Sequence, residues 1–80
     1  MKIQLLSFGI ARDLLGSSSI EIEITNETSI ESFKKIILKQ FPKIASVSSY
    51  AIAVNEEYAN DSLVLKENDV VAIIPPVSGG

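Results

Sequence analysis

The sequence contains no cysteine and no histidine. The absence of cysteine excludes disulfides, thiolate nucleophiles and iron–sulfur clusters. Without either residue type the usual zinc sites cannot form. Histidine is also the side chain that most often serves as a general base near neutral pH. Any chemistry in this chain must therefore depend on other groups.

Basic residues are in the minority: seven lysines and arginines stand against ten aspartates and glutamates, and the formal net charge is −3. Nucleic-acid surfaces normally need a basic excess, so we expect no nucleic-acid partner. The apolar runs are short, and none approaches the ~20 residues of a membrane span. The N-terminus lacks the apolar core of a signal peptide. We therefore expect a cytoplasmic protein with no membrane association.

Motifs that bind small ligands are also missing. The 80 residues suffice for one small domain but not for a large internal substrate cleft. The four glycines form no phosphate-binding loop, so we expect no bound ATP and no other cofactor. Glu56 and Glu57 are adjacent and point apart, which does not suit paired acid–base catalysis. Asp61 and Asp69 could meet a magnesium ion, but turn positions explain them better, so we predict no metal site.

Alternating patterns predict the first two strands. Residues 2–8 form a strand in which Leu6 and Phe8 share one face, because strand side chains alternate. Residues 20–24 alternate isoleucine and glutamate without a fault, which is typical of an edge strand with its isoleucines in the core. Between them, residues 11–15 are predicted to form one helical turn.

Helical spacing predicts the main helix. Thr28 is expected to cap its N-terminus, with Glu31 completing a capping box, and Pro42 is expected to end it. One apolar stripe faces the core and consists of Ile30, Phe33, Ile36, Ile37 and Phe41. Leu38 falls outside this stripe and has no assigned place. The lysines on the opposite face fit a solvated surface, and a docking patch is the alternative.

Further segments complete the predicted sheet. Residues 50–54 predict a strand and residues 55–58 a turn, and residues 68–69 form a second turn. Residues 70–74 are continuously apolar, which indicates a central strand covered on both faces. This order resembles the ubiquitin-like β-grasp, an α+β fold with a mixed sheet of four or five strands and one main helix.

The last six residues differ from the rest, so we divide the chain into a domain at residues 1–74 and an extended tail at residues 75–80. The tail consists of Pro75, Pro76, Val77, Ser78, Gly79 and Gly80. Its prolines fix φ at about −65° and donate no backbone hydrogen bond, so the sheet must end here and the tail should project. Six extended residues reach about 20 Å. The two glycines lack side chains and could enter a narrow channel.

The α-carboxylate of Gly80 is the reactive group that such a tail would present. A carboxylate is anionic at neutral pH and is a poor electrophile. It needs activation, most simply as an acyl-adenylate made with ATP. Because the chain has no nucleotide-binding motif, a partner enzyme must supply that step.

Three stretches make the chain similar to a known family: Phe8–Asp13, Ala53–Tyr58 and, most specifically, Asn68–Gly80. They resemble the small subunits of molybdopterin synthase, the sulfur carriers of molybdenum-cofactor biosynthesis. A glycine usually stands in that family where this chain has Asn68, and asparagine can hold the same turn.

The resemblance implies a mechanism for the tail of this non-catalytic subunit. An E1-like enzyme adenylates Gly80 with ATP, and sulfur from a persulfide donor replaces the adenylate to give a thiocarboxylate. The tail then enters the large synthase subunit, in a heterotetramer of two small and two large subunits, and donates sulfur to cyclic pyranopterin monophosphate. Two alternatives use the same tail: a sulfur carrier of another pathway, such as thiamine thiazole synthesis, and a ubiquitin-like modifier of target proteins.

Leu6, Phe8 and Arg12 are the candidate contacts with these partners. Exposed apolar patches often mark interfaces, and Leu6 and Phe8 lie on the strand face away from the predicted core. The alternative is that residues 11–15 or a loop cover them. Arg12 could pair with a partner carboxylate or, alternatively, with Asp13 or a nearby glutamate.

Overall fold

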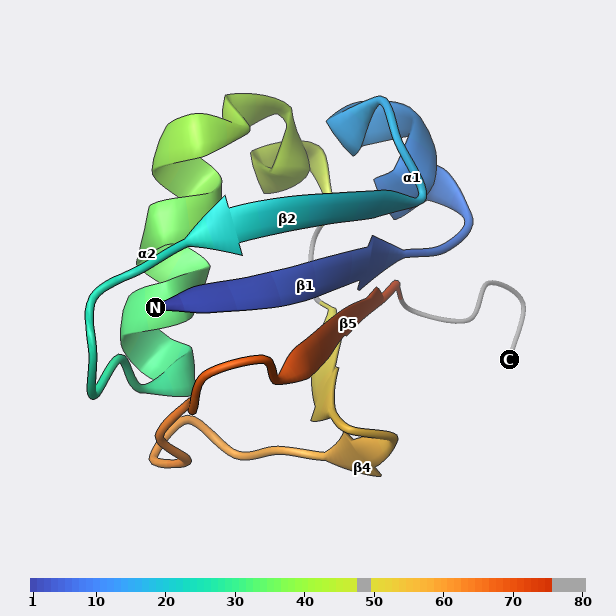
Figure 1. Cartoon of the computed structure of the whole chain (residues 1–80). Coiled ribbons are helices and arrows are strands. Elements are labelled where there is room, and N and C mark those ends of the chain that lie inside the picture. The colour runs from blue at the N-terminus through green and yellow to red at the C-terminus, as the bar shows by residue number, and fades with distance from the viewer. Residues whose placement is uncertain (48–49, 76–80) are drawn as a thin grey trace.

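Residues 1–47 and 50–75 are described by the computed structural model. Their elements are, in chain order, β1 (Lys2–Ser7), α1 (Ile10–Leu15), β2 (Ser19–Glu23), α2 (Ile30–Gln40), the 3₁₀ helix η1 (Pro42–Ser46), β3 (Ala51–Val54), β4 (Glu57–Tyr58) and β5 (Val70–Ile74). The five strands form one sheet in the order β2-β1-β5-β3-β4, in which β1 and β5 run parallel and the other neighbours run antiparallel. The predicted α+β architecture, a mixed sheet with one main helix, is confirmed (Figure 1).

The first two strands have the predicted alternation. Ile3 and Leu5 of β1 are each 1% exposed, whereas Lys2 and Gln4 lie in solvent. β2 is an edge strand, and its central isoleucine, Ile22, is buried. Ile3 lies opposite Ile22 in the antiparallel register, so both strands turn their apolar residues to the same face of the sheet.

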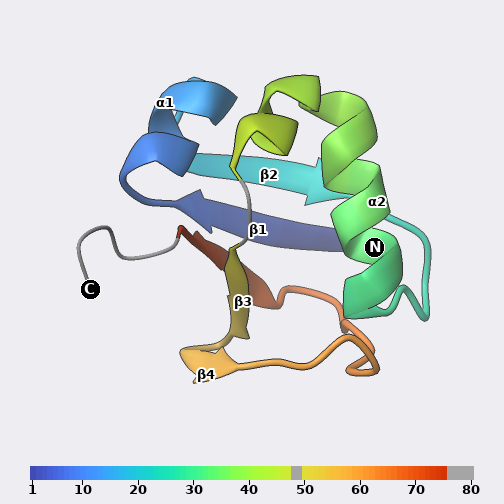
Figure 2. The same ribbon diagram turned by 180° about the vertical axis from the view of Figure 1, so that it is seen from behind.

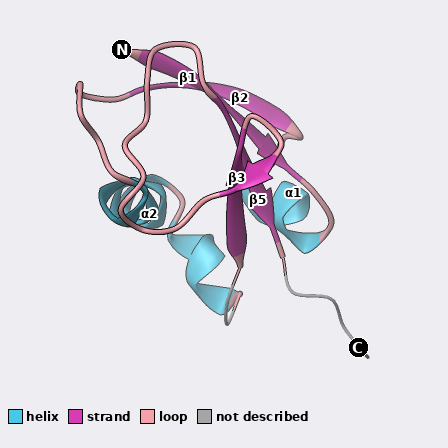
Figure 3. Ribbon diagram, turned by 90° about the horizontal axis from the view of Figure 1, so that it is seen from below, coloured by secondary structure: helices cyan, strands magenta, loops and turns pink. Residues whose placement is uncertain are grey.

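The helices gather on that face of the sheet. In Figure 2, α2 lies in front of β1 and β2, and η1 continues from α2 toward α1, which it contacts. Seen from below, α2 and η1 lie on the same side of β3 and β5 (Figure 3). Ile30, Phe33 and Ile37 of α2 are fully buried against the strands, and Ile44 and Leu65 complete the core.

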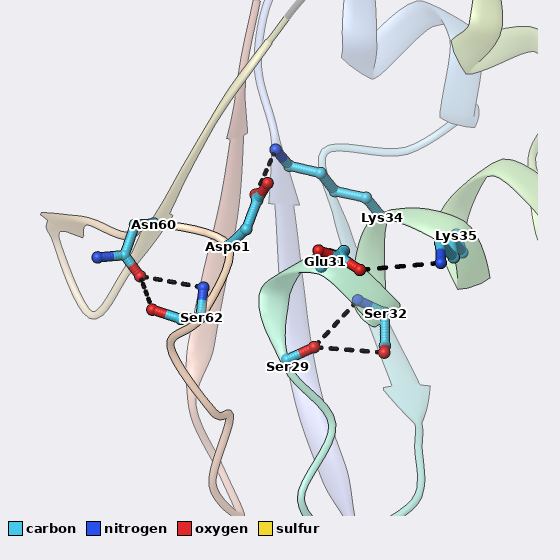
Figure 4. Close-up of polar contacts among 8 residues, drawn as sticks. All are labelled: Ser29, Glu31, Ser32, Lys34, Lys35, Asn60, Asp61 and Ser62. Carbon is cyan, nitrogen blue, oxygen red and sulfur yellow. Dashed lines mark hydrogen bonds and ion pairs between the residues drawn. The ribbon is translucent and has the colours of Figure 1, made fainter.

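The main helix begins one residue later than predicted. Its N-cap is Ser29, whose Oγ accepts a hydrogen bond from the Ser32 amide at 3.2 Å (Figure 4). Thr28, the predicted cap, is buried, and its hydroxyl donates to a carbonyl of the preceding loop at 2.7 Å. Glu31 lies in the first turn and forms an exposed ion pair with Lys35 at 3.9 Å. The predicted capping box is therefore wrong.

The chain after α2 departs from the prediction twice. α2 ends at Gln40, close to the predicted stop, but Pro42 opens η1, which was not predicted. Proline is favoured at the first position of a helix, where its missing N–H costs no hydrogen bond. The predicted turn at residues 55–58 is confined to Asn55 and Glu56, with φ of 51° and 71°, because the next two residues pair with β3 as β4.

β5 is a central strand, as predicted, but only one of its faces is sealed. Val71 and Ile73 are 0% exposed, whereas Val70, Ala72 and Ile74 are half-buried. The prediction that this strand is covered on both faces is therefore wrong. The reason is that the described helices lie on one side of the sheet and no described residue forms a second layer. We call the other side of the sheet the open face.

Candidate partner-binding surface

The open face carries an apolar pocket of about 340 Å³. Its lining consists of Leu6, Phe8, Ala53, Glu56, Tyr58, Val70, Ala72 and Ile74. Phe8 is 52% exposed and Leu6 is half-buried. The helical turn that could have covered them instead directs Ala11 and Leu15 into the core. The structure thus places Leu6 and Phe8 together at the surface, and their role as partner contacts stays a prediction.

The register of four strands explains why this pocket is hollow. Leu6 lies beside Ala72 in the parallel β1–β5 pair, and Ala72 lies opposite Ala53 in the antiparallel β5–β3 pair. Ala53 in turn lies opposite Tyr58 of β4. Two small residues occupy the middle of this row and two larger ones its ends, so the centre is recessed. An exposed apolar recess is typical of a surface that binds another protein.

The tail begins at the rim of the pocket. β1 and β5 run parallel with Ser7 beside Ile73, so both strands end at the same edge of the sheet. There Pro75 meets the turn between β1 and α1, since a β-carbon at Gly9 would lie 3.5 Å from the Pro75 Cγ. Gly9 has φ 57° and ψ −133°, a conformation that residues with a side chain rarely adopt. The turn that carries Phe8 therefore lies close to Pro75, where the tail begins.

The remainder of the predicted tail lies outside the described residues: Pro76, Val77, Ser78, Gly79 and Gly80. Its projection from the sheet and the accessibility of the Gly80 carboxylate stay predictions. The described residues fix the starting point of the tail, at the edge where the open face ends.

A hydrogen-bond network joins the two turns that flank β3 and β5. The Asn55 Nδ2 donates to the Asp69 Oδ1 at 3.0 Å, and the Asn55 Oδ1 accepts from the Val70 amide at 3.0 Å. The second carboxylate oxygen of Asp69 accepts from the Lys66 amide at 2.8 Å. The network fixes the start of β5. This strand supplies part of the open face and leads into the tail. Sequence reasoning assigned both residues to turns and missed the link between them.

Arg12 lies exposed on α1. Its carbonyl accepts a hydrogen bond from the Gly16 amide at 2.9 Å, which closes the helix. The three ion pairs found among the described residues involve neither Arg12 nor Asp13, so the alternative of a local pair between them is not formed. Recognition of a partner carboxylate by Arg12 stays a prediction.

The two aspartates considered for magnesium each bond within the chain. Asp61 accepts from the Lys34 Nζ at 2.9 Å (Figure 4), and Asp69 belongs to the network described above. Residues 1–47 and 50–75 contain no group of three or more acidic, histidine or cysteine side chains that could hold a metal ion. Within the same residues, no helix has the length and hydrophobicity that crossing a membrane requires.

Comparison with known sequences relates nearly the whole chain to one family. Residues 5–80 match the model of the ThiS family. The chain is 33% identical over 81 residues to the molybdopterin synthase sulfur carrier subunit of Arabidopsis thaliana, a match that covers all of this chain and 84% of that protein. It is 36% identical over 83 residues to the subunit of the same name from Caenorhabditis elegans, covering all of this chain and 99% of the relative.

Solved structures have the same fold. A protein from Pyrococcus furiosus assigned as subunit 1 of a molybdopterin converting factor superposes with a TM-score of 0.87 at 28% identity, over 96% of this chain and 99% of that one. The complex of subunits 1 and 2 of the molybdopterin-converting factor from Helicobacter pylori contains a chain with a TM-score of 0.70 at 24% identity, and the match covers all of both chains. The predicted ubiquitin-like β-grasp fold is confirmed.

Proposed function

Since this chain belongs to the ThiS family and shares a third of its residues with molybdopterin synthase sulfur carrier subunits, we propose that it is such a carrier. In this role it is the small, non-catalytic subunit of molybdopterin synthase. The observation that carries the proposal is the extent of the match, which spans this chain and nearly the full length of the Caenorhabditis elegans subunit.

The chemistry would take place at the Gly80 α-carboxylate. An E1-like enzyme joins it to the AMP part of ATP and releases pyrophosphate, which turns a poor electrophile into a reactive acyl-adenylate. The terminal sulfur of a persulfide attacks the acyl carbon and AMP leaves, which gives an acyl disulfide between the donor and the carrier. A thiol then attacks the donor's sulfur, a new disulfide forms on the donor, and the carrier leaves as a thiocarboxylate. Two features support this route: the family match runs through Gly80, and the chain has no cysteine that could hold the sulfur.

The open face would bind the partners that load and empty the tail. Pro75 lies close to the turn beside Phe8, so a protein bound to Leu6 and Phe8 would also lie next to the start of the tail. From the end of the sheet, the tail residues Pro75 to Gly79 would span the distance to a partner's active site. For the large subunit, the Helicobacter pylori complex provides a precedent for the pairing of two such subunits. We expect a heterotetramer of two small and two large subunits, with Arg12 near a carboxylate of a partner.

Intact-protein mass spectrometry tests the proposal. The chain is incubated with its E1-like enzyme, ATP and a persulfide donor, and we expect the exchange of one oxygen for sulfur at Gly80. A matched control with one alanine added after Gly80 should keep the fold and gain no transferable sulfur. A ladder of conjugates with lysines of other proteins would favour a modifier. A thiocarboxylate that the large synthase subunit cannot use would favour a sulfur carrier of another pathway.

A further inference from the structure

A second apolar hollow lies on the helical side of the molecule. It has a volume of about 260 Å³ between α2 and η1, and we call it the α2–η1 groove. Leu38, Ile44, Val47 and Tyr50 supply its apolar lining. Leu38 is 46% exposed, on a helix whose other apolar residues pack against the core. It is thus a large apolar side chain that the core does not use, and it is the residue of this helix that the sequence pattern left without a place.

The surroundings of the groove are basic in an otherwise acidic chain. Lys34 and Lys35 line it, and Lys39 and Lys43 lie on the same two helices. These are four of the seven basic residues, and residues 34–47 contain no aspartate or glutamate. The other three basic residues share the rest of the chain with all ten acidic ones. Residues 34–47 therefore carry four positive charges and no negative one, and the acidic residues paired with the two lining lysines, Glu31 and Asp61, come from outside this segment. An excess of positive charge attracts negatively charged partners.

The two lining lysines are held to different degrees. The Lys34 Nζ donates to Asp61 at 2.9 Å and lies 6.0 Å from the centre of the Tyr50 ring. Lys35 has only an exposed ion pair with Glu31 at 3.9 Å (Figure 4). Pairs of this kind are weak and exchange readily with other carboxylates. Lys34 thus shapes the wall of the groove, and Lys35 is available to an incoming acidic group.

We propose that the α2–η1 groove binds an acidic amphipathic segment of a partner protein. One leucine- or phenylalanine-sized side chain would enter the hollow against Leu38, and flanking carboxylates would meet the lysines. The volume of about 260 Å³ is smaller than that of most small-molecule sites, which usually measure roughly 300–1,000 Å³, so a single apolar side chain suits the hollow better than a small-molecule ligand. A nucleic acid would use the lysines and leave the apolar hollow unfilled. An anionic membrane would need a continuous apolar helix face, and α2 turns that face to the core.

The groove is lined by α2, η1 and the residues that follow η1, and both helices lie on the helical side of the sheet (Figures 1 and 2). The pocket of the open face is lined by residues of the opposite side. A partner in the groove would therefore leave Leu6, Phe8 and the root of the tail accessible. The two surfaces could be occupied at the same time, for example by two proteins that act together on the tail. The binding capacity of the groove does not depend on the proposed function of the tail.

Nuclear magnetic resonance titration of the full chain, labelled with ¹⁵N, tests the proposal. The probe is an end-blocked peptide in which leucines at helical spacing are separated by glutamates. We expect amide shifts at residues 34–47 and at Tyr50, and binding that weakens as salt shortens the Debye length to about 3 Å at roughly 1 M. Leu38→Ala should weaken binding about tenfold, because it removes the half-exposed apolar contact. Val64→Ala, a matched control that is also 46% exposed but lies elsewhere, should leave binding unchanged.

A second pair of measurements separates charge from hydrophobicity. Lys35→Gln should weaken binding of the glutamate peptide, and a peptide with glutamines in place of the glutamates should bind Lys35→Gln and the original chain equally poorly. Shifts that map to Leu6, Phe8 and Ala72 would overturn the proposal. Equal affinity for both peptides would overturn it as well. So would tighter binding of single-stranded RNA or of phosphatidylserine vesicles at the same residues, since either would assign the groove to another class of partner.

Discussion

The two faces of the sheet are built by the same strands and differ in how far their side chains are buried. On the helical side, Ile3, Val71 and Ile73 are 0–1% exposed. On the open face, the neighbouring Leu6 and Ile74 are only half-buried. An 80-residue chain has one main helix with which to cover a five-stranded sheet, so it can seal one face only. From this contrast we expect residues on the sealed face to stabilise the fold and those on the open face to contribute to binding.

The sharpest test of this contrast compares two adjacent residues of β5. Ile73→Ala removes a fully buried side chain and should lower the free energy of unfolding by about 2–5 kcal/mol. Ile74→Ala changes a half-buried residue on the open face and should cost less than about 1.5 kcal/mol. Urea denaturation measures both variants. Equal losses of stability would show that the open face also serves as core.

Phe8→Ala tests whether the open face contributes to partner binding. The affinity for the large synthase subunit should fall about tenfold to a hundredfold, since exposed aromatic residues are common interface anchors. The free energy of unfolding should change by less than about 1 kcal/mol, because Phe8 is 52% exposed. Leu63→Ala, at an exposed apolar residue outside the pocket of the open face, is the control for calorimetric titration. A large loss of stability with unchanged affinity would place Phe8 in the core.

Asn55→Ala tests whether the hydrogen bonds between the turn after β3 and the turn before β5 stabilise the fold. The substitution removes the hydrogen bonds to Asp69 and Val70 and places a less tolerant residue at φ 51°, so we expect a loss of about 1–3 kcal/mol. Asn55→Gly also removes the bonds but tolerates the positive φ, and it should cost less. Thermal unfolding of the two variants separates these causes. Identical unfolding of all three chains would show that the link carries no stability.

The smallest expected effect on stability concerns Tyr50, which lies on the helical side of the sheet. Burial raises the pKa of its hydroxyl above the ordinary value, against the opposing effect of Lys34. As pH rises past about 10, the tyrosine of the unfolded chain ionises before that of the folded chain, so the free energy of unfolding should fall. Tyr50→Phe lacks this contribution, and its stability should decline less steeply over that range. Parallel curves for the two chains in denaturant titrations would contradict this expectation.

Local patterns were enough to predict β1, β2, β3, β5 and the main helix, and they placed Phe8 on the strand face away from the core. These features depend on the alternation or spacing of side chains within one segment, and this pattern can be recognised in the sequence of that segment alone. The edge position of β2 followed from its glutamates for the same reason. The root of the tail was also predictable, because proline cannot continue the strand pairing.

What failed depends on residues far away in the chain. Thr28 and Ser29 are both good capping residues, and the choice between them is influenced by the Leu65 amide, which bonds to the Thr28 carbonyl at 2.8 Å. The apolar run of β5 resembles a strand buried on both sides, and only the number of helices available to cover it decides otherwise. The pocket of the open face required Ala53 and Ala72 to lie opposite each other, which is a matter of strand register. No local pattern contains that information.

The mass of the chain before and after one reaction with the large subunit is the most direct test of the proposed sulfur transfer from the tail. The chain is first converted to its thiocarboxylate and then mixed with the large subunit and cyclic pyranopterin monophosphate. We predict that two chains return to the carboxylate form for each molybdopterin formed. Molybdopterin that accumulates while the chain keeps its sulfur would contradict a role for Gly80 as the donor.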